Sequence, residues 1–560
     1  MKIRFVVCVL LLITGAAAQD QPDPVLTALK QELTRSFQNL KKTQVPPYFL
    51  SYELTDNHSI QVTASFGALM SSDDRRSRLL DIDLRVGNYD LDNTHPISGS
   101  SGRAMSMRQI AMPIEDGGDA LRNAIWFATD EKYKDAVERL ASVKTNVQVK
   151  VAAEDKSADF SREAPQKHLE PDAPFFYDRT EWENRVRRYT ALFTGHPGIY
   201  HAVASASGEV ETRRYVNSDG SEIRISAPLY QLSISATAKA EDGMVLPLHL
   251  TYMAWEPTGL PDDAAVTKDV KNMVEKLVAL RTAPLADAYT GPAILSGRAS
   301  AVFFHEIFGH RIEGQRQKEA DDAQTFKKKV NQQVLPPFLS VYSDPTLRRL
   351  ASNDLVGFYS YDDEGVKADR LTIVDKGILR NFLMSRSPIE GFSHSNGHGR
   401  RQQGYPVEAR QSNLLVESAK KVSRAELKKM LIEQVKSSKK PYGLFFDDIE
   451  GGFTFTQRGT PNAFNVMPTL VYRVYPNGNE ELVRGVDLIG TPLTAFSRIV
   501  ATDDQTGIFN GVCGAESGWV PVSAVSPGML VAQIETQRKE KSQEREPILP
   551  PPTEDAGGVK

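Results

Sequence analysis

The segment His305-Glu-Ile-Phe-Gly-His310 constrains the local fold of this chain more than any other segment does. Two imidazoles with a carboxylate beside the first offer two neutral nitrogen ligands and a base for metal-bound water. On an ideal helix, residues five apart lie roughly 140° apart around the axis. If His305 and His310 share one metal ion, the helix must therefore carry an extra residue or break near Gly309. The simpler alternative is an amphipathic helix that happens to carry two histidines.

The chain has two cysteines, and we expect only one of them in the mature protein. Cys8 lies in the N-terminal hydrophobic segment, whereas Cys513 lies in Gly511-Val-Cys-Gly-Ala-Glu-Ser-Gly518. An unpaired thiol in an exported protein is open to oxidation, and metal ligation protects it as a thiolate. Cys513 is therefore a candidate third metal ligand. A role as a small buried hydrophobic side chain explains a free cysteine equally well.

Residues 1–18 have the three parts of a secretory signal peptide. A basic end is followed by an apolar run over residues 5–13 and by the small residues Ala16-Ala17-Ala18. The apolar run is too short to span a bilayer, and no later segment supplies about twenty apolar residues. We therefore expect a periplasmic or secreted protein that starts at Gln19 and has no membrane span after signal cleavage.

Loss of the signal peptide changes the net charge from −4 to −6, because two of the 67 basic residues and none of the 71 acidic ones lie within it. A weakly acidic surface gives no electrostatic reason to bind nucleic acid or anionic membranes. At the other end, residues 536–560 are charged and then rich in proline. Such a segment cannot bury a core and is expected to be a disordered tail.

The mature chain is predicted to be an α+β protein in two parts. Residues 19–285 alternate helical and strand-like segments and predict an N-terminal α/β lobe with antiparallel sheets. Residues 286–535 predict a β-rich metal-binding catalytic domain with the His-Glu helix near its start. Residues 154–174 are charged and aperiodic, and form either a linker or a surface insertion. In the N-terminal lobe the helices are expected at residues 23–40, 119–143, 181–192 and 262–280, and the strands at 48–54, 59–66, 77–86, 200–207, 211–216 and 221–226.

Together these features resemble the TldD/PmbA family of metallopeptidases, over residues 200–530 above all. His305–His310 with Ile312-Glu-Gly314 resembles the metal motif of that family, and Gly511-Val-Cys-Gly514 resembles its late cysteine segment. The other matching segments follow the order of the family: Asp362-Asp-Glu-Gly365, Gly397-His-Gly-Arg-Arg401, Gln411-Ser-Asn413 and Glu450-Gly-Gly452.

The resemblance implies roles for four residues. It assigns His305, His310 and Cys513 to a metal ion, and Glu306 to the general base. The ion would be zinc, with another divalent transition metal such as iron as the alternative. The partner-type members of the family lack the His-Glu motif, so this chain resembles a catalytic member. The resemblance also implies peptide or unfolded-protein substrates, and a homodimer or a heterodimer with a metal-free relative.

A pair of histidines and a pair of arginines are further candidates for metal or substrate contacts. His394 and His398 have helical metal-ligand spacing, but the Ser, Asn and Gly around them predict a loop. Arg400 and Arg401 either bind a peptide carboxylate or are ordinary surface charges.

Four acidic residues are further candidates for contacts with the metal or its ligands. Asp447, Asp448 and Glu450 are expected at a polar strand end rather than on a metal. Glu313 either ligates the metal, orients a ligand histidine or pairs with a neighbouring arginine.

The sequence predicts a metal-dependent peptidase in which Glu306 deprotonates metal-bound water that attacks a peptide carbonyl. Exposed strand edges would bind an extended peptide by strand addition. The alternative is a non-catalytic binding or maturation subunit with a structural metal, whose fourth ligand is Glu313 or Asp448. A hydrolase of a non-peptide amide is the third possibility, because the site chemistry does not encode the acyl group.

Overall fold

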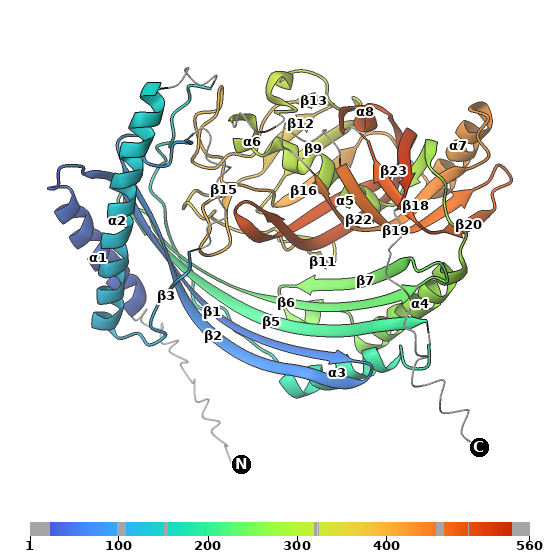
Figure 1. The fold of residues 1–560 in the computed structure, drawn as a ribbon, viewed down its shortest axis with the longest axis horizontal. Helices are drawn as coiled ribbons and strands as arrows, with labels where there is room; N and C mark the ends of the chain where they lie inside the picture. The colour runs from blue at the N-terminus through green and yellow to red at the C-terminus, as the bar shows by residue number, and fades with distance from the viewer. Residues whose placement is uncertain are drawn as a thin grey trace, which may run out of the picture.

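The computed structural model combines a curved N-terminal sheet with a β-rich C-terminal domain. Figure 1 shows the sheet, in blue to green, curving beneath the C-terminal domain, in yellow to red. The predicted signal peptide and residues 540–560 of the predicted tail lie outside the described residues. The structure describes residues 23–97, 108–149, 155–196, 198–318, 322, 324–454, 464–490 and 492–539.

The N-terminal sheet has the strand order β3-β2-β1-β5-β6-β4, with β7 also paired to β6. Its neighbours β1 and β2, β1 and β5, and β5 and β6 are all antiparallel. The bounds of these strands are β1 Pro47–Ser65, β2 Ala68–Val86, β3 Ile110–Ala111, β4 Lys167–Leu169, β5 Ile199–Asn217, β6 Glu222–Lys239 and β7 Val245–Ala254.

Several predicted strand boundaries in this sheet are wrong. The strands expected at 48–54 and 59–66 are parts of the single strand β1, which ends at Ser65, and those expected at 200–207 and 211–216 form the single strand β5. The polar residues between each pair looked like breaks in the sequence. In the structure Asp56, Asn57 and His58 keep the antiparallel register with β5. The polar side chains are tolerated because they meet charged partners, as Asp56 meets Arg78 and Arg214. The strands expected at 77–86 and 221–226 are longer than predicted, because β2 begins at Ala68 and β6 runs to Lys239.

Four helices pack on this sheet, and all four were predicted. Asp23 caps α1 by accepting from the N–H of Leu26, and Asp262 caps α4 by accepting from the N–H of Ala265. Side chains of β5 alternate between a helix-packed face with Ala202, Ala204 and Ala206 and an opposite face with charged residues. The helix bounds are α1 Pro24–Leu40, α2 Gly118–Val149, α3 Arg179–Ala191 and α4 Asp263–Thr282.

The C-terminal domain contains a small closed barrel. Strands β8, β18, β19, β21 and β23 form a circuit, because β23 pairs with both β21 and β8. The sheet continues from β23 through β16, β9, β12 and β13. These strands are β8 Tyr289–Leu295, β9 Leu339–Ser343, β12 Leu371–Asp375, β13 Ile378–Leu379, β16 Asn413–Ser418, β18 Gly443–Thr454, β19 Phe464–Val474, β20 Glu480–Val483, β21 Val486–Ile489, β22 Ile499–Ala515 and β23 Gly518–Arg538.

The predicted α+β fold is thus confirmed, with an antiparallel N-terminal sheet and a β-rich C-terminal domain. β23 continues to Arg538 and pairs there with Val486, so it extends into the first residues of the segment expected as a tail. Among the described residues no helix is both long and apolar enough to cross a membrane. The shorter elements are β10 Arg349–Leu350, β11 Asn353–Asp354, β14 Gly399–Arg400, β15 Glu408–Ala409, β17 Lys421–Val422, α6 Gln315–Lys318, α7 Arg424–Ser437 and α8 Pro492–Ser497.

The segment expected as a linker or surface insertion is packed between the two parts. Its β4 pairs with β6, and the Phe160 side chain is buried. The backbone N–H of Ser161 donates to the carbonyl of Arg386 (2.8 Å), and the Arg386 guanidinium donates to the carbonyl of Ser161 (2.7 Å). The segment therefore ties the N-terminal sheet to the C-terminal domain.

The helix α5, Gly297–Ile307, carries the His-Glu motif and lies in the core of the C-terminal domain. It packs against β18, β22 and β23, and its residues from Ala299 to Ile307 are buried. Burial explains the apolar run Ala301–Phe304 in its middle. Ser296 caps the helix by accepting from the N–H of Ala299.

Candidate metal centre

The helix α5 ends between the two histidines of the motif. Ile307 is its last residue, and Gly309–Ile312 form a 3₁₀ turn. This break brings the ring centroids of His305 and His310 to 5.2 Å. The predicted break near Gly309 is therefore confirmed. A side chain at Gly309 would displace Gln411, because a Cβ there would lie 1.8 Å from Oε1 of Gln411.

Cys513 reaches the two histidines from the β22–β23 hairpin, where it is paired with Val520. Its Sγ lies 3.3 Å from Nε2 of His310. One ligand atom from each of His305, His310 and Cys513 lies within 4.8 Å of the others. All three side chains are buried, so residues far apart in the sequence converge in one water-poor place.

Glu313 approaches His310 from the other side of the imidazole ring. Its Oε1 lies 3.2 Å from Nδ1 of His310, whereas Nε2 faces Cys513. The Glu313 carboxylate accepts from Nε of Arg316 (2.8 Å) and lies 3.6 Å from Nε of Arg410. Of the roles expected for Glu313, this position suits orientation of the His310 ring rather than ligation.

The charges around Cys513 favour a thiolate. Burial raises the pKa of Cys513, but His310, His305 and Arg410 outweigh burial and hold the pKa well below its usual value. Burial lowers the pKa of His310, but Cys513 and Glu313 raise it to about 10. The lowered pKa of Cys513 and the raised pKa of His310 together indicate a thiolate–imidazolium pair in the metal-free protein.

A transition metal fits these residues. Cys513 offers an ionised thiolate, which is the form that ligates metals. Nδ1 of His305 is buried and has no hydrogen-bond partner among the described residues, so a ring nitrogen is left for another ligand. One thiolate with two imidazoles is a donor set that suits zinc and related metals.

Glu306 follows His305 directly and is 8% exposed. Burial raises its pKa, as does Cys513, while His305, His310 and a hydrogen bond from the backbone N–H of Gly452 act in the opposite direction. A raised pKa brings a carboxylate closer to the range in which it accepts and returns protons near neutral pH. Gly452 belongs to the segment Glu450-Gly-Gly452, which therefore borders the metal centre.

The structure places the other candidate residues away from this centre. His398 is buried in a loop, with its Nε2 2.8 Å from Oγ of Ser343, and burial lowers its pKa to about 4. His394 is 68% exposed. Asp448 pairs with Arg298, and Glu450 pairs with His249. Asp448 and Glu450 thus hold basic partners rather than a metal, but they lie within β18, Gly443–Thr454, beside its irregular pairing with β19, and not at a strand end as expected.

Sequence analysis did not identify Arg410 as part of the site. It is fully buried, and its Nη2 donates to Sγ of Cys513 (3.2 Å) and to the carbonyl of the same residue (2.8 Å). No periodicity or motif around Arg410 in the sequence pointed to this contact.

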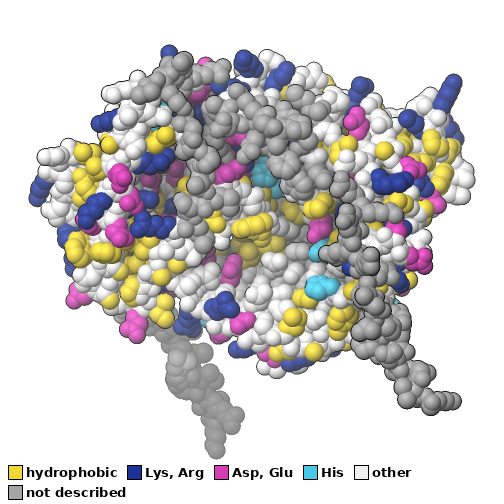
Figure 2. Space-filling view, in the orientation of Figure 1, with side chains coloured by type: hydrophobic (Ala, Val, Ile, Leu, Met, Phe, Trp, Pro, Cys, Tyr) yellow, Lys and Arg dark blue, Asp and Glu magenta, His cyan; other side chains and the backbone are white. Residues whose placement is uncertain are grey.

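A cavity between the two parts was missed as well. It has a volume of about 1230 Å³ and is lined by Glu209, Glu211 and Arg213 on the sheet side and by Arg400 and Trp519 on the other side. Figure 2 shows hydrophobic side chains in the hollow between the sheet and the C-terminal domain. The sequence did contain one indication of this cavity. Along one strand, Ala204 and Ala206 occupy alternate positions to Glu209 and Glu211, so the alanines and the carboxylates lie on opposite faces of the sheet.

Comparison with known proteins places the C-terminal part of the chain in a described family. Residues 288–538 match the PmbA/TldA metallopeptidase C-terminal domain. A metalloprotease of Archaeoglobus fulgidus is 27% identical over 325 residues, which is 57% of this chain and 70% of that protein. A zinc metalloprotease TldD homolog of Saccharolobus solfataricus is 24% identical over 348 residues, which is 61% of this chain and 72% of that protein.

A solved structure shares the whole fold. TldE from Thermococcus kodakarensis superposes with a TM-score of 0.58 at 13% sequence identity, covering 91% of this chain and 100% of that one. The likeness extends through the N-terminal sheet, although at this identity it concerns the fold alone.

We predict that Cys513 is ionised in the metal-free mature protein at neutral pH. Because the neighbouring cations stabilise the charged form, its thiolate absorbance should persist below about pH 8.5, the usual pKa of a thiol. His310→Gln removes the first of these cations and should move the titration upward. Ultraviolet titration of metal-stripped protein checks this, with Cys513→Ser as the blank. A wild-type midpoint at the usual thiol pKa would contradict it.

Proposed function

Residues 288–538 belong to the PmbA/TldD metallopeptidases, and on that premise we propose that this protein is a metal-dependent peptidase. One observation carries the proposal. Two histidines, a cysteine and a buried carboxylate from distant parts of the chain meet at the break in α5. These are the groups that metal-assisted hydrolysis of an amide needs.

His305, His310 and Cys513 would hold the metal, with zinc as the first choice and iron as the alternative. When bound, such an ion supplies Lewis-acid polarisation of a carbonyl and makes water more acidic. Glu313 keeps the His310 ring in place through Nδ1, so Nε2 stays directed towards Cys513. The zinc metalloprotease named among the relatives supports the choice of metal.

Glu306 would act as the general base. It lies beside the ligand histidine His305, and its raised pKa lets it accept a proton from the attacking water and return it to the leaving amine. The backbone N–H of Gly452 fixes the carboxylate without neutralising it. The peptide bond breaks between the carbonyl carbon and that amine, which leaves as a neutral group.

The rival reading, a structural metal, needs a fourth protein ligand. Glu313 contacts the far side of the His310 ring, and Asp448 is engaged with Arg298. Among the described residues no other His, Cys, Asp or Glu joins the three candidate ligands as a fourth member. These contacts favour a site with an open position, as a hydrolytic centre requires.

We also propose that the substrates are peptides or unfolded segments, and that the protein works as a homodimer or with a metal-free relative. The family to which residues 288–538 belong supports a peptide substrate. Strand edges beside the centre would bind an extended backbone with little regard to its sequence.

The general-base role is tested by Glu306→Gln, which keeps the size of the side chain but cannot accept the proton. We expect hydrolysis of an unfolded protein to fall by about 10² or more, with metal content and melting temperature near those of the wild type. Glu417→Gln is a matched control, because Glu417 is an exposed carboxylate paired with Arg370. Unchanged hydrolysis in Glu306→Gln would remove the mechanism, and loss of metal or fold would make Glu306 structural.

We propose further that the mature chain begins at Gln19 and is periplasmic or secreted. The basic end, the apolar run and Ala16-Ala17-Ala18 support this assignment. N-terminal sequencing of the protein from its native host should give Gln19 as the first residue. Retention of Met1 or Lys2 would refute export by this signal.

A further inference from the structure

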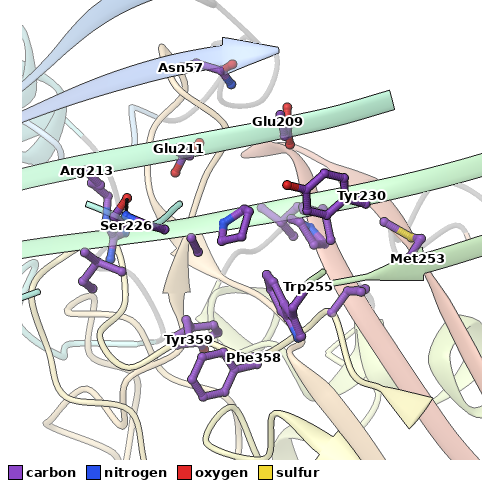
Figure 3. A pocket seen from close by; sticks show the side chains of 18 of the residues that line it. Asn57, Glu209, Glu211, Arg213, Ser226, Tyr230, Met253, Trp255, Phe358 and Tyr359 are labelled. Atoms are coloured by element: carbon purple, nitrogen blue, oxygen red, sulfur yellow. Dashed lines mark hydrogen bonds between the residues drawn. The ribbon is translucent and has the colours of Figure 1, made fainter. Parts of the chain in front are cut away.

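The cavity of about 1230 Å³ between the sheet and the C-terminal domain has two unlike walls. Figure 3 shows Glu209 and Glu211 on the sheet side, with Tyr359 and Phe358 on the opposite side. Arg400 belongs to the second wall, where its guanidinium lies 4.8 Å from the centroid of the Tyr359 ring. The volume exceeds the roughly 300–1000 Å³ of ordinary small-molecule sites, so several residues of a peptide have room.

Arg400 is a buried cation without an anionic partner. It is 8% exposed, and its Nη1 donates to the carbonyls of Gln411 (2.7 Å) and Pro521 (2.7 Å). It forms no ion pair with any residue in the described part of the chain, whereas its neighbours Arg401 and Arg213 pair with Glu53 and Asp363. A buried charge is costly unless it is paired.

The chemistry of this guanidinium selects a carboxylate. Burial lowers the pKa of Arg400 to about 10, so the side chain is still a cation at neutral pH. A guanidinium donates two parallel hydrogen bonds to a carboxylate, which gives both affinity and a fixed orientation. An anionic ligand in the cavity would therefore supply a directly contacting counter-charge, in addition to the favourable electrostatic interaction of Arg400 with Cys513.

Arg400 is connected through one intervening residue to each of the two elements that carry the candidate metal ligands. Gln411, whose carbonyl accepts from Arg400, donates from its side-chain amide to the carbonyl of His305 (3.2 Å). Pro521 follows Val520, the strand partner of Cys513. A carboxylate held by Arg400 is thus bound at the wall that the cavity shares with the metal centre.

The sheet wall carries two carboxyl groups beside Arg213, whose own charge is paired with Asp363. Glu209 and Glu211 are two residues apart on β5 and so face the same way. Neither forms an ion pair with a residue that the structure describes, although Oε2 of Glu211 accepts from the amide of Gln403 (2.7 Å). Burial, with help from Glu209, raises the pKa of Glu211 to about 7. A bound ammonium would favour the charged form of both carboxylates.

We propose that this cavity binds short peptides by their two free ends, with the C-terminal carboxylate on Arg400 and the N-terminal ammonium against Glu209 and Glu211. The inference rests on the proposed function only in treating these peptides as the substrates or products of the adjacent centre. Within the proposed substrate class, it assigns the tightest binding to short peptides with free termini.

Binding to the full-length, metal-loaded Glu306→Gln protein tests this without interference from turnover. The ligands are tetra-alanine with free ends, its C-terminal amide and its N-acetyl form, measured by calorimetry. We expect amidation and acetylation each to weaken binding about tenfold or more, the size of a lost charged hydrogen bond. In Arg400→Met, the C-terminal amide and the free acid should bind with equal affinity. In the double variant Glu209→Gln/Glu211→Gln, the N-acetyl peptide and the peptide with a free amine should bind with equal affinity.

A matched control is Arg348→Met, because Arg348 lines the same cavity but rests on the rings of Trp255 and Phe358. It should keep the preference for the free carboxylate. Equal binding of all three ligands to the parent protein would overturn the inference whatever the variants do. A preference that survives in Arg400→Met, checked for native melting temperature, would also overturn it.

The test separates this inference from the peptidase proposal. If the Glu306→Gln protein discriminates between the peptide ends while the wild type hydrolyses no peptide, the binding site stands and the peptidase proposal falls. If the wild type hydrolyses peptides and no end preference exists, the peptidase stands and the end-binding cavity falls.

Discussion

The break of α5 after Ile307 is the constraint on which the candidate site depends. The helix is closely packed at both ends, against backbone at its start and against a side chain at its end. At its start, a Cβ on Gly297 would lie 2.4 Å from the backbone nitrogen of Gly507. At its end, Gln411 fills the space beside Gly309. Because the barrel strands bury the helix between these points, its last turn and the following 3₁₀ turn deliver His305 and His310 to one place.

Buried charge is the second organising feature of the molecule. Glu313 is balanced by Arg316 and Arg410, and Arg410 in turn contacts Cys513. Each ion is costly to bury alone, but the chain of contacts supplies every one with a partner of opposite sign. His310 stands within this chain, so its ring is oriented from one side by Glu313 and faces the thiol on the other. Two buried arginines, Arg400 and Arg311, depart from this rule, since neither forms an ion pair within the described part of the chain, and Arg400 is the one that lines the cavity.

Sequence analysis could predict the parts of the fold and site that local patterns encode. Capping aspartates and apolar stripes located the helices, as at Asp23 and Asp262. The His-Glu spacing and Cys513, the cysteine expected to remain after signal cleavage, pointed to four residues that lie close together in the structure, although ligation by three of them stays a prediction. The predicted interruption of β1 was wrong because polar residues inside this strand pair with arginines that are distant in sequence.

The sequence could not show which surfaces face each other in the folded protein. The period of β5 shows that Glu209 and Glu211 share a face, but not that the C-terminal domain stands opposite them. Arg410 shows the same limit, because nothing near it in the sequence marks its contact with Cys513. Both are long-range consequences of how the barrel and the curved sheet are joined.

The central claim is that His305, His310 and Cys513 hold one catalytic metal ion, and elemental analysis of the purified mature protein tests it most directly. The account predicts about one transition-metal ion per chain in the wild type and its loss in Cys513→Ser and in His305→Ala. His394→Ala, which removes an exposed imidazole, should keep the full load. A full stoichiometric load in both Cys513→Ser and His305→Ala would contradict the claim.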